Sequence, residues 1–318
     1  MDTHQQTDGL MDLLPGLIVK AQSGFFTVRT GAGNLTCQLR GRLKKKRVAT
    51  DLAAIGDRVT VRALPDGTGT VEEVLPRTRV LSRSAAAGGG RRGYAKSDSE
   101  QVIVANPDQA VFIFACAQPA PHLRMLDRFL VVAERAGIPA VVCANKADLV
   151  GPDEPEKRFG LYRKIGYPVL IASAVTGAGV DELRAILRGK LSVLSGPSGV
   201  GKSSLLNVIQ PGLGLAVSHV SEAIEKGRHT TVAPELIELE EGGFVADTPG
   251  LRAIAFWDIE PEELDAYFPE IRPLVEHCSF GDCTHENTPG CAVIRAVEQG
   301  AVSPERYESF LRLRRGEK

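Results

Sequence analysis

The sequence predicts an α/β protein in three parts: a small β-barrel, a doubly wound domain with a mostly parallel sheet, and a helical C-terminal region. Short strand-like segments separated by Gly, Asn, Asp and Pro indicate the barrel, over residues 16–83. Apolar strand segments that alternate with helical ones indicate the doubly wound domain, over residues 101–256. The stretch 257–318 is polar and helical and contains a cluster of cysteines.

The barrel is predicted from segments without a helical period: GLIVKA, GFFTVRT, LTCQLRG, DRVTVRAL and GTGTVEEVL. Residues 1–15 are predicted to be a flexible tail, and the basic, Gly- and Ala-rich residues 84–100 a flexible linker. The basic run RGRLKKKR at 40–47 has two interpretations of equal weight, a solvated charged hairpin or a loop that contacts RNA.

The doubly wound domain is predicted from strands of nearly continuous apolar character, as is typical of strands buried on both faces of a parallel sheet. Its predicted strands are AVFIFAC, IPAVVCANKAD, YPVLIAS, LSVLSG and GFVADTPG. Its predicted helices are LRMLDRFLVVAERAG, VDELRAILRG and KSSLLNVI. Strand and helix thus alternate along the chain, which is the pattern of βα units.

The overall composition excludes some classes of protein. The chain has 318 residues, a net charge of −1 and a pI of about 6.6, so any nucleic-acid-binding surface has to be local. It contains no run of about 18 apolar residues, and its polar, acidic start lacks the pattern of a signal peptide. We therefore expect a cytoplasmic protein that does not bind membranes, and nothing suggests more than a monomer.

The segment GPSGVGKS at 196–203 follows an apolar strand and opens a helix, which is the context of a phosphate-binding loop. Its glycines let backbone N–H groups curl around phosphate oxygens. Lys202 is predicted to bridge the β- and γ-phosphates, and Ser203 to bind Mg²⁺. A glycine-rich turn that carries Lys-Ser by chance is the alternative, and the flanking strand and helix argue against it.

The motif NKAD ends a predicted strand and, in a chain that also has a phosphate loop, indicates a guanine-reading loop. The Asp148 carboxylate can accept hydrogen bonds from the ring N–H and the amino group of guanine, which adenine does not offer. Asn145 would brace the site, Lys146 would lie over the base, and the later SAVTG segment would add the backbone N–H of Ala174. Without the phosphate loop, NKAD would be explained as well by a capped strand-to-helix turn.

The two motifs and SAVTG together define one predicted nucleotide site. Its predicted guanine-nucleotide-binding residues are Asn145, Lys146, Ala147, Asp148, Ser173, Ala174, Gly196, Pro197, Ser198, Gly199, Val200, Gly201, Lys202, Ser203 and Ser204. The predicted ligands are GTP or GDP with Mg²⁺.

The motif DTPG at the end of another strand is predicted to sense the γ-phosphate. Asp247 would hold Mg²⁺ through water, and the N–H of Gly250 would meet the γ-phosphate. Between the phosphate loop and DTPG lies KGRHTT, where either Thr230 or Thr231 would complete the Mg²⁺ shell, and the spacing does not choose between them.

The residue after Gly250 is Leu251, which cannot orient an attacking water. His229, in the KGRHTT segment, is the best substitute that the sequence offers. Hydrolysis is therefore predicted to be slow until a partner orders that segment. The predicted catalytic residues are His229, Lys202, Thr230, Thr231, Asp247 and Gly250.

The C-terminal cysteines have the spacing of a metal site. Cys278, Cys283, His285 and Cys291 supply three thiolates and one imidazole, which fill a tetrahedral Zn²⁺ shell and leave no open position. The sequence therefore predicts one structural Zn²⁺ per chain. His277, one residue before the first cysteine, is the weaker candidate for the imidazole.

The motifs stand in a permuted order, because the base-reading motifs NKAD and SAVTG precede the phosphate loop, HTT and DTPG. Joining the termini of an ordinary GTPase and opening the chain elsewhere gives this order. With a barrel before it and a cysteine cluster after it, the chain resembles the RsgA (YjeQ/YloQ) family of circularly permuted GTPases. The resemblance covers nearly the whole chain and rests on VANPDQ, NKAD, SAVTGAGVDEL, GPSGVGKSSLLN, GRHTT, DTPGLR and CSFGDCTHENTPGC.

The resemblance implies an OB-fold barrel, a circularly permuted P-loop GTPase domain and a helical zinc-binding domain. It implies action late in maturation of the small ribosomal subunit, with the subunit and its rRNA as partners, other assembly factors nearby, and GTP hydrolysis stimulated by the subunit. It also implies His285 as the fourth zinc ligand and a role for His229 in hydrolysis. The barrel, the arginines of 77–92 and the C-terminal RYESFLRLRR are the candidate RNA-binding surfaces.

Two other functions are compatible with a phosphate loop. A phosphotransferase that acts on a small molecule would not need the guanine reader NKAD. An RNA-binding scaffold with a purely structural nucleotide would not need Lys202, Ser203 and Asp247. The GTPase prediction is the one that uses all of these motifs.

Overall fold

The structure is a computed structural model that describes residues 13–44, 51–84, 100–215, 235–247 and 259–317. The chain divides into two compact units, residues 1–106 with 231–237, and residues 107–230 with 238–318. The first unit contains a barrel, and the second contains a parallel sheet and the C-terminal region.

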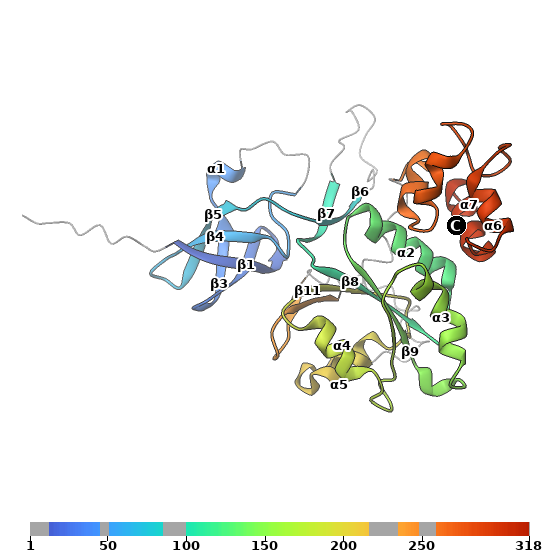
Figure 1. Ribbon diagram of the computed structural model, residues 1–318. Helices are drawn as coiled ribbons and strands as arrows, with labels where there is room; N and C mark the ends of the chain where they lie inside the picture. The colour runs from blue at the N-terminus through green and yellow to red at the C-terminus, as the bar shows by residue number, and fades with distance from the viewer. Residues whose placement is uncertain (1–12, 45–50, 85–99, 216–234, 248–258, 318) are drawn as a thin grey trace, which may run out of the picture. The chain divides into compact units, whose positions relative to one another are not determined.

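The barrel of the first unit is closed and has the strand order β1-β2-β3-β5-β4 (Figure 1). Its strands are β1 (Leu13–Gln22), β2 (Phe25–Thr30), β3 (Gly33–Leu39), β4 (Arg58–Ala63) and β5 (Thr68–Val74), with a short helix α1 (Gly41–Lys44) after β3. Neighbouring strands are antiparallel except β3 and β5, which are parallel. Five short strands closed in this way form an OB-like barrel. Fully buried apolar side chains fill it: Ile18, Val28, Cys37, Val61 and Val71.

A two-stranded hairpin follows the barrel in the same unit. Strands β6 (Val80–Ser84) and β7 (Glu100–Ala105) pair in antiparallel fashion. The Arg77 guanidinium, before β6, donates two hydrogen bonds of 2.8 Å to the fully buried carboxylate of Asp57, before β4. This buried pair fixes the start of the hairpin against the barrel.

A six-stranded sheet of order β10-β9-β8-β11-β13-β12 belongs to the second unit, and only its edge strand β12 includes residues assigned to the first. Its strands are β8 (Gln109–Ala115), β9 (Ala140–Asn145), β10 (Val169–Ile171), β11 (Leu191–Ser195), β12 (Leu236–Glu238) and β13 (Phe244–Asp247). The pairs from β10 to β13 are all parallel. Every residue of β8, β9 and β11 is buried, as expected for central strands covered on both faces.

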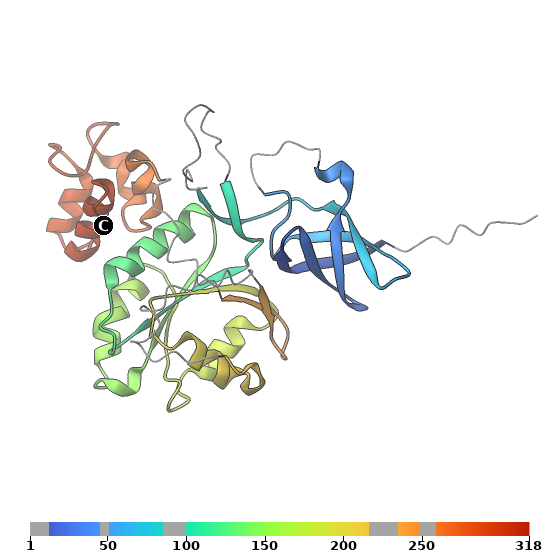
Figure 2. The same ribbon diagram turned by 180° about the vertical axis from the view of Figure 1, so that it is seen from behind.

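Helices cover both faces of this sheet. Figures 1 and 2 show α2 and α3 on one face and α4 and α5 on the other. Their bounds are α2 (Leu123–Arg135), α3 (Glu154–Lys164), α4 (Val180–Leu187) and α5 (Lys202–Ile209), with short 3₁₀ helices η1 (Ala147–Leu149) and η2 (Pro211–Leu213). The layers are those of a doubly wound α/β domain.

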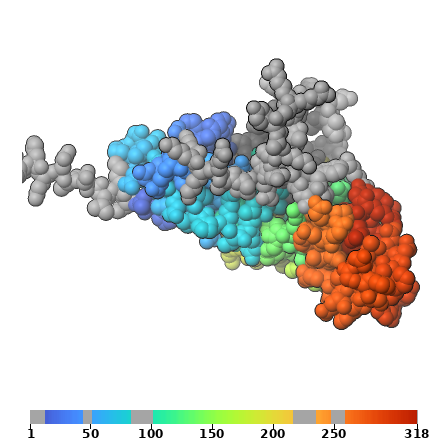
Figure 3. Space-filling view, turned by 90° about the horizontal axis from the view of Figure 1, so that it is seen from above, coloured from blue at the N-terminus to red at the C-terminus, as the bar shows by residue number. Residues whose placement is uncertain are grey.

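The C-terminal region is a small helical lobe that packs against α2. In the space-filling view its orange and red atoms adjoin green atoms of the same unit (Figure 3). It contains η5 (Pro261–Tyr267), η6 (Arg272–His277), α6 (Ala292–Glu298) and α7 (Pro304–Arg314). Its apolar core includes Phe268, Ile271 and Phe310, and it also takes in Val131 of α2. The lobe and the helix layer therefore share one core.

A buried ionic group joins the lobe to α2. The Arg306 side chain of α7 is 1% exposed and donates to Asp127 of α2 at 2.7 Å and to Glu270 at 2.6 Å. Its guanidinium also lies over the Phe268 ring, 4.4 Å from the centroid. Tyr162 of α3 donates to the same Asp127 carboxylate at 2.8 Å, so three elements meet at one buried charge.

The predicted fold class is confirmed: an OB-like barrel, a doubly wound sheet with a permuted strand order, and a helical C-terminal region with a Cys/His cluster. Three cysteines outside the C-terminal cluster, Cys37, Cys116 and Cys143, are free and buried. Among the described residues, none of the helices is both long and apolar enough to cross a bilayer.

Candidate guanine-nucleotide site and metal cluster

The predicted nucleotide-binding motifs follow strands β9, β10, β11 and β13 of one sheet, with β8 between β9 and β11. NKAD begins at the last residue of β9, SAVTG follows β10, the phosphate loop follows β11, and Asp247 ends β13. Because these strands are parallel, all four carboxyl ends lie at one edge of the sheet. This edge is where doubly wound domains bind nucleotides.

A direct hydrogen bond ties the base-reading loop to the phosphate loop. Asn145 is fully buried, and its Nδ2 donates to the backbone oxygen of Val200 at 2.7 Å. A Cβ on Gly201, which has φ +94°, would lie 2.4 Å from this Nδ2, so only glycine allows the approach. The other amide atom, Asn145 Oδ1, is buried without a hydrogen-bond partner in the described part of the chain. Residues 13–44, 51–84, 100–215, 235–247 and 259–317 thus supply no donor to this acceptor, as expected at a ligand site.

Ser173 fixes the orientation of the Asp148 carboxylate. The Ser173 hydroxyl is 1% exposed and donates to Asp148 Oδ1 at 2.5 Å. Its oxygen accepts from the backbone N–H groups of Val175 and Thr176, at 3.2 and 3.1 Å. With both N–H groups pointing at the oxygen, the hydroxyl proton is directed to the carboxylate. The carboxylate is thus held in place before any base arrives.

The phosphate loop leaves β11 through a close contact with β8. Gly196 lies so near the neighbouring strand that a Cβ there would be 2.0 Å from the backbone oxygen of Ile113. The loop ends where α5 begins, at Lys202. Lys202 Nζ donates to the backbone oxygens of Gly196 and Pro197, both at 2.9 Å. The ammonium group therefore lies at the first residues of the phosphate loop. Such a charge can exchange carbonyl oxygens for phosphate oxygens.

Several predicted site residues are not characterised by the structure. The backbone of Asp247 pairs with Leu194 at the end of β13. His229, Thr230, Thr231 and Gly250 lie outside the described residues. Their roles stay predictions.

Two hydrogen bonds at the base-reading loop were not predicted, one from the predicted Lys146 and one from Arg158. Lys146 has a left-handed backbone, φ 59°, and its Nζ donates to the backbone oxygen of Gln118 after β8. Arg158 of α3 donates to the backbone oxygen of Cys116 at 2.5 Å. Both contacts join segments far apart in the sequence, so no local sequence pattern predicts them.

Comparison with known proteins agrees with this geometry. The model of the RsgA GTPase family matches residues 74–257, and that of the RsgA N-terminal domain matches residues 15–71. The small ribosomal subunit biogenesis GTPase RsgA of Gemmatimonas aurantiaca is 47% identical over 302 residues, which cover 94% of this chain and 96% of that protein.

The chain belongs to the RsgA family of GTPases. It is accordingly a GTP hydrolase. Among solved structures, YjeQ from Thermotoga maritima superposes with a TM-score of 0.77 at 35% identity, over 96% of this chain and 98% of that one. YloQ, described as a circularly permuted GTPase, superposes with a TM-score of 0.73 at 31% identity, over 99% of this chain and 97% of that one. The predicted family resemblance is therefore confirmed.

The chain also brings the four predicted metal ligands together. The ligand atoms of Cys278, Cys283, His285 and Cys291 all lie within 4.8 Å of one another. His285 Nδ1 is 3.6 Å from Cys278 Sγ and 3.5 Å from Cys291 Sγ, and these two sulfurs are 3.9 Å apart. Tetrahedral zinc with ordinary bond lengths requires ligand separations of about 3.6 Å for S and N and about 3.8 Å for two sulfurs. The cluster fits a tetrahedral metal ion, and the exposed His277 is not part of it.

The protein environment acts differently on two of the thiols. Burial raises the pKa of Cys291 to about 11. Burial also opposes ionisation of Cys283, but the backbone N–H of His285 and the Thr288 side chain, with the neighbouring thiols, hold the pKa of Cys283 below its usual value. Deprotonating a buried thiol such as Cys291 is costly unless a cation compensates the thiolate, as a bound metal does.

Two of the arginines predicted to face RNA are not available to it. Arg306, at the start of RYESFLRLRR, is buried in the ion pairs with Asp127 and Glu270, so the prediction is wrong for this residue. Arg77 has a 14% exposed side chain and pairs with Asp57, so it too is a structural residue. The hydrogen bonds that Arg77 donates to Asp57 raise the pKa of Arg77, although burial opposes this.

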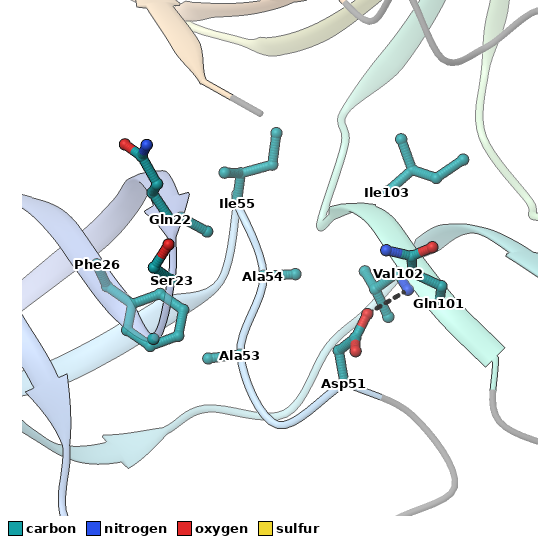
Figure 4. A pocket seen from close by; sticks show the side chains of 12 residues that line it. Gln22, Ser23, Phe26, Asp51, Ala53, Ala54, Ile55, Gln101, Val102 and Ile103 are labelled. Carbon is teal, nitrogen blue, oxygen red and sulfur yellow. Dashed lines mark hydrogen bonds between the residues drawn. The ribbon is translucent and has the colours of Figure 1, made fainter. Parts of the chain in front are cut away.

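A cavity of about 240 Å³ opens beside the barrel within the first unit (Figure 4). The buried Phe26, Ala54 and Val102 lie at its walls, while Gln22 and Asp51 give it polar groups. Asp51 Oδ2 accepts from the backbone N–H of Val102 at 2.9 Å, which holds the loop after residue 50 against β7.

Proposed function

We propose that this GTPase selects guanine nucleotides through Asp148 and acts on the small ribosomal subunit. The observation that carries the first part is the Asn145–Val200 hydrogen bond, which makes the base-reading loop and the phosphate loop one rigid site. Asp148, which is exposed in the free protein, accepts the two guanine donors, and adenine disfavours binding because it would cover this carboxylate without donating to it. Lys146 covers the base, and the backbone N–H of Ala174 adds a contact to the purine.

The residues of the phosphate loop hold the triphosphate. Backbone N–H groups from Gly196 to Gly201 surround the phosphate oxygens, and Lys202 bridges the β- and γ-phosphates. Ser203 and Asp247 would hold Mg²⁺, which would neutralise charge on the phosphates. The carbonyl oxygens that Lys202 now contacts are replaced by phosphate oxygens when nucleotide binds.

Hydrolysis is assigned to residues beyond the phosphate loop. Gly250 contacts the γ-phosphate, one of Thr230 and Thr231 completes the Mg²⁺ shell, and His229 orients the attacking water. The intrinsic rate is slow, because the water-orienting residue depends on a partner for its position.

The partner is the small ribosomal subunit, in the late steps of its maturation in the cytoplasm. The support is the near full-length similarity to relatives described as small ribosomal subunit biogenesis GTPases. The barrel, with the basic run at 40–47 beside it, contacts rRNA, and a monomeric chain acts together with other assembly factors.

The Cys/His cluster is proposed to hold one structural Zn²⁺. Three thiolates and one imidazole are a soft, closed ligand set that suits zinc and leaves no position for a substrate. The ion would cross-link the end of η6, the start of α6 and the loop between them.

A GTPase assay with and without purified small subunits tests the proposal. We expect the protein without subunits to hydrolyse GTP slowly and the rate to rise strongly when subunits are added. Lys202→Ala should show neither the slow hydrolysis nor the stimulated hydrolysis. His229→Ala should retain GTP binding and lose the stimulated rate. An unchanged rate on adding subunits would reject the ribosomal partner and leave the nucleotide chemistry intact.

A further inference from the structure

We infer that Asp265 is the positioning residue of the metal cluster, because its carboxylate holds His285 in the tautomer that presents Nδ1 to the metal. The inference rests on the proposed zinc site. It adds a residue that is not a ligand, lies outside the cysteine-rich segment and belongs to a different element, η5.

The two ring nitrogens of His285 face different partners. Nδ1 lies 3.6 and 3.5 Å from the sulfurs of Cys278 and Cys291, so this nitrogen points into the cluster. Nε2 lies 3.3 Å from Asp265 Oδ2. A carboxylate accepts hydrogen bonds, so Nε2 carries the proton and Nδ1 keeps the lone pair that a metal needs.

His285 is otherwise held by its backbone and its surroundings. It is fully buried and has a left-handed backbone with φ 58°. Tyr307 of α7 donates its hydroxyl to the His285 backbone oxygen at 2.6 Å, and the Phe310 ring lies 6.0 Å from the imidazole. These contacts fix where the residue sits, but neither of them selects which ring nitrogen is protonated. Asp265 is the group in the described lobe that does so.

The position of Asp265 gives this contact a further significance. It lies on η5, which comes after the DTPG motif in the chain, whereas the four ligands all lie after the end of η6. With an 18% exposed side chain it is shielded from water, so the hydrogen bond is stronger than a surface one. The metal cluster therefore holds η5 in place through Asp265, besides organising its own loop.

Zinc affinity of the full-length chain tests the inference, measured by competition with a chromophoric chelator. A carboxylate behind a zinc-bound histidine is worth about 10–100-fold in affinity. We expect Asp265→Ala to weaken zinc binding by that factor, Asp265→Asn to weaken it less because the amide oxygen still accepts, and Asp265→Glu to recover part of the loss. Asp282→Asn is the control: it removes the same charge beside Cys283, is exposed, and should stay within about twofold of the wild type.

A nitrogen-15 spectrum of the histidine rings gives a readout that general loss of packing would not produce. Coordination through Nδ1 by itself leaves the proton on Nε2, so the metal-free proteins are compared: the wild type should carry the His285 proton on Nε2, and Asp265→Ala should lose this preference. Wild-type zinc affinity in Asp265→Ala, or the same tautomer preference in metal-free Asp265→Ala as in the wild type, would overturn the inference. Failure of the wild type itself to bind zinc would instead reject the metal site on which the inference rests.

Discussion

Removing the Arg306 side chain should release the C-terminal lobe from α2. In Arg306→Ala the carboxylates of Asp127 and Glu270 lose their cation while they stay 4% and 6% exposed. Breaking a buried ion pair by deleting one partner costs about 3–5 kcal/mol, because the remaining charge is left without compensation. That is a large share of the ~5–15 kcal/mol that stabilises a typical domain.

Native-state hydrogen exchange of the α7 amides measures this cost locally. Since each 1.4 kcal/mol is about tenfold, protection of α7 should fall by roughly a hundredfold to a few thousandfold. The barrel strands β1 to β5 should keep their protection, which makes them an internal reference. Arg306→Lys keeps the positive charge but not the planar guanidinium that donates to both Asp127 and Glu270. We therefore expect an intermediate loss of α7 protection.

Arg312→Ala is the matched control on the same helix. Arg312 is 37% exposed and pairs with Glu308 one turn away, an arrangement worth about 0.3–0.5 kcal/mol. Its α7 protection should fall by less than about threefold. If Arg306→Ala changed protection as little as this control does, the buried ionic group would not be what docks the lobe.

Three further predictions concern the base, the barrel and the metal. Asp148→Asn should relax the preference for GTP over ATP, and a competition titration with both nucleotides measures it; full retention of the preference would reject the assigned base contact. Burial opposes ionisation of Glu72, but hydrogen bonds from Arg40 and Arg62 hold its pKa below the usual 4.5. Ionised Glu72 therefore stabilises the folded protein at neutral pH, and this stabilisation is lost as the pH falls below about 4.5. Acid denaturation of Glu72→Gln should therefore converge with that of the wild type at low pH, and a constant gap would contradict this. Chelation of zinc should expose α6 to exchange without affecting β11, and equal protection with and without chelator would argue against a structural ion.

The sequence predicts those parts of the nucleotide site that are encoded locally. The phosphate loop and NKAD each combine a short spacing with a strand before them, so their chemistry is visible in a few residues. The tie between Asn145 and Val200 is not visible, because it joins loops that only the sheet order makes neighbours. The same holds for Ser173, whose hydroxyl holds Asp148 rather than the purine.

The wrong prediction for Arg306 has a physical cause. RYESFLRLRR reads as a basic, weakly amphipathic helix, and a single arginine on its buried face gives no local signal. What buries Arg306 is the pair of acidic partners, Asp127 and Glu270, which lie 179 and 36 residues away along the chain. Likewise, the pairing of β7 with β6 across residues 85–99 is a long-range contact that the apolar pattern of β7 does not reveal.

The burial of the scattered cysteines determines how the protein will react with alkylating reagents. Burial raises the pKa of Cys37 and Cys116 to about 11 and that of Cys143 to about 12, so these thiols are almost entirely protonated at neutral pH. The thiolate is the nucleophilic form, and the lowered pKa of Cys283 makes it the more reactive thiol once metal is removed. Iodoacetamide should then label Cys283 of the metal-free cluster before Cys37, Cys116 or Cys143. The extent of this labelling would measure the fraction of the protein that has lost its metal.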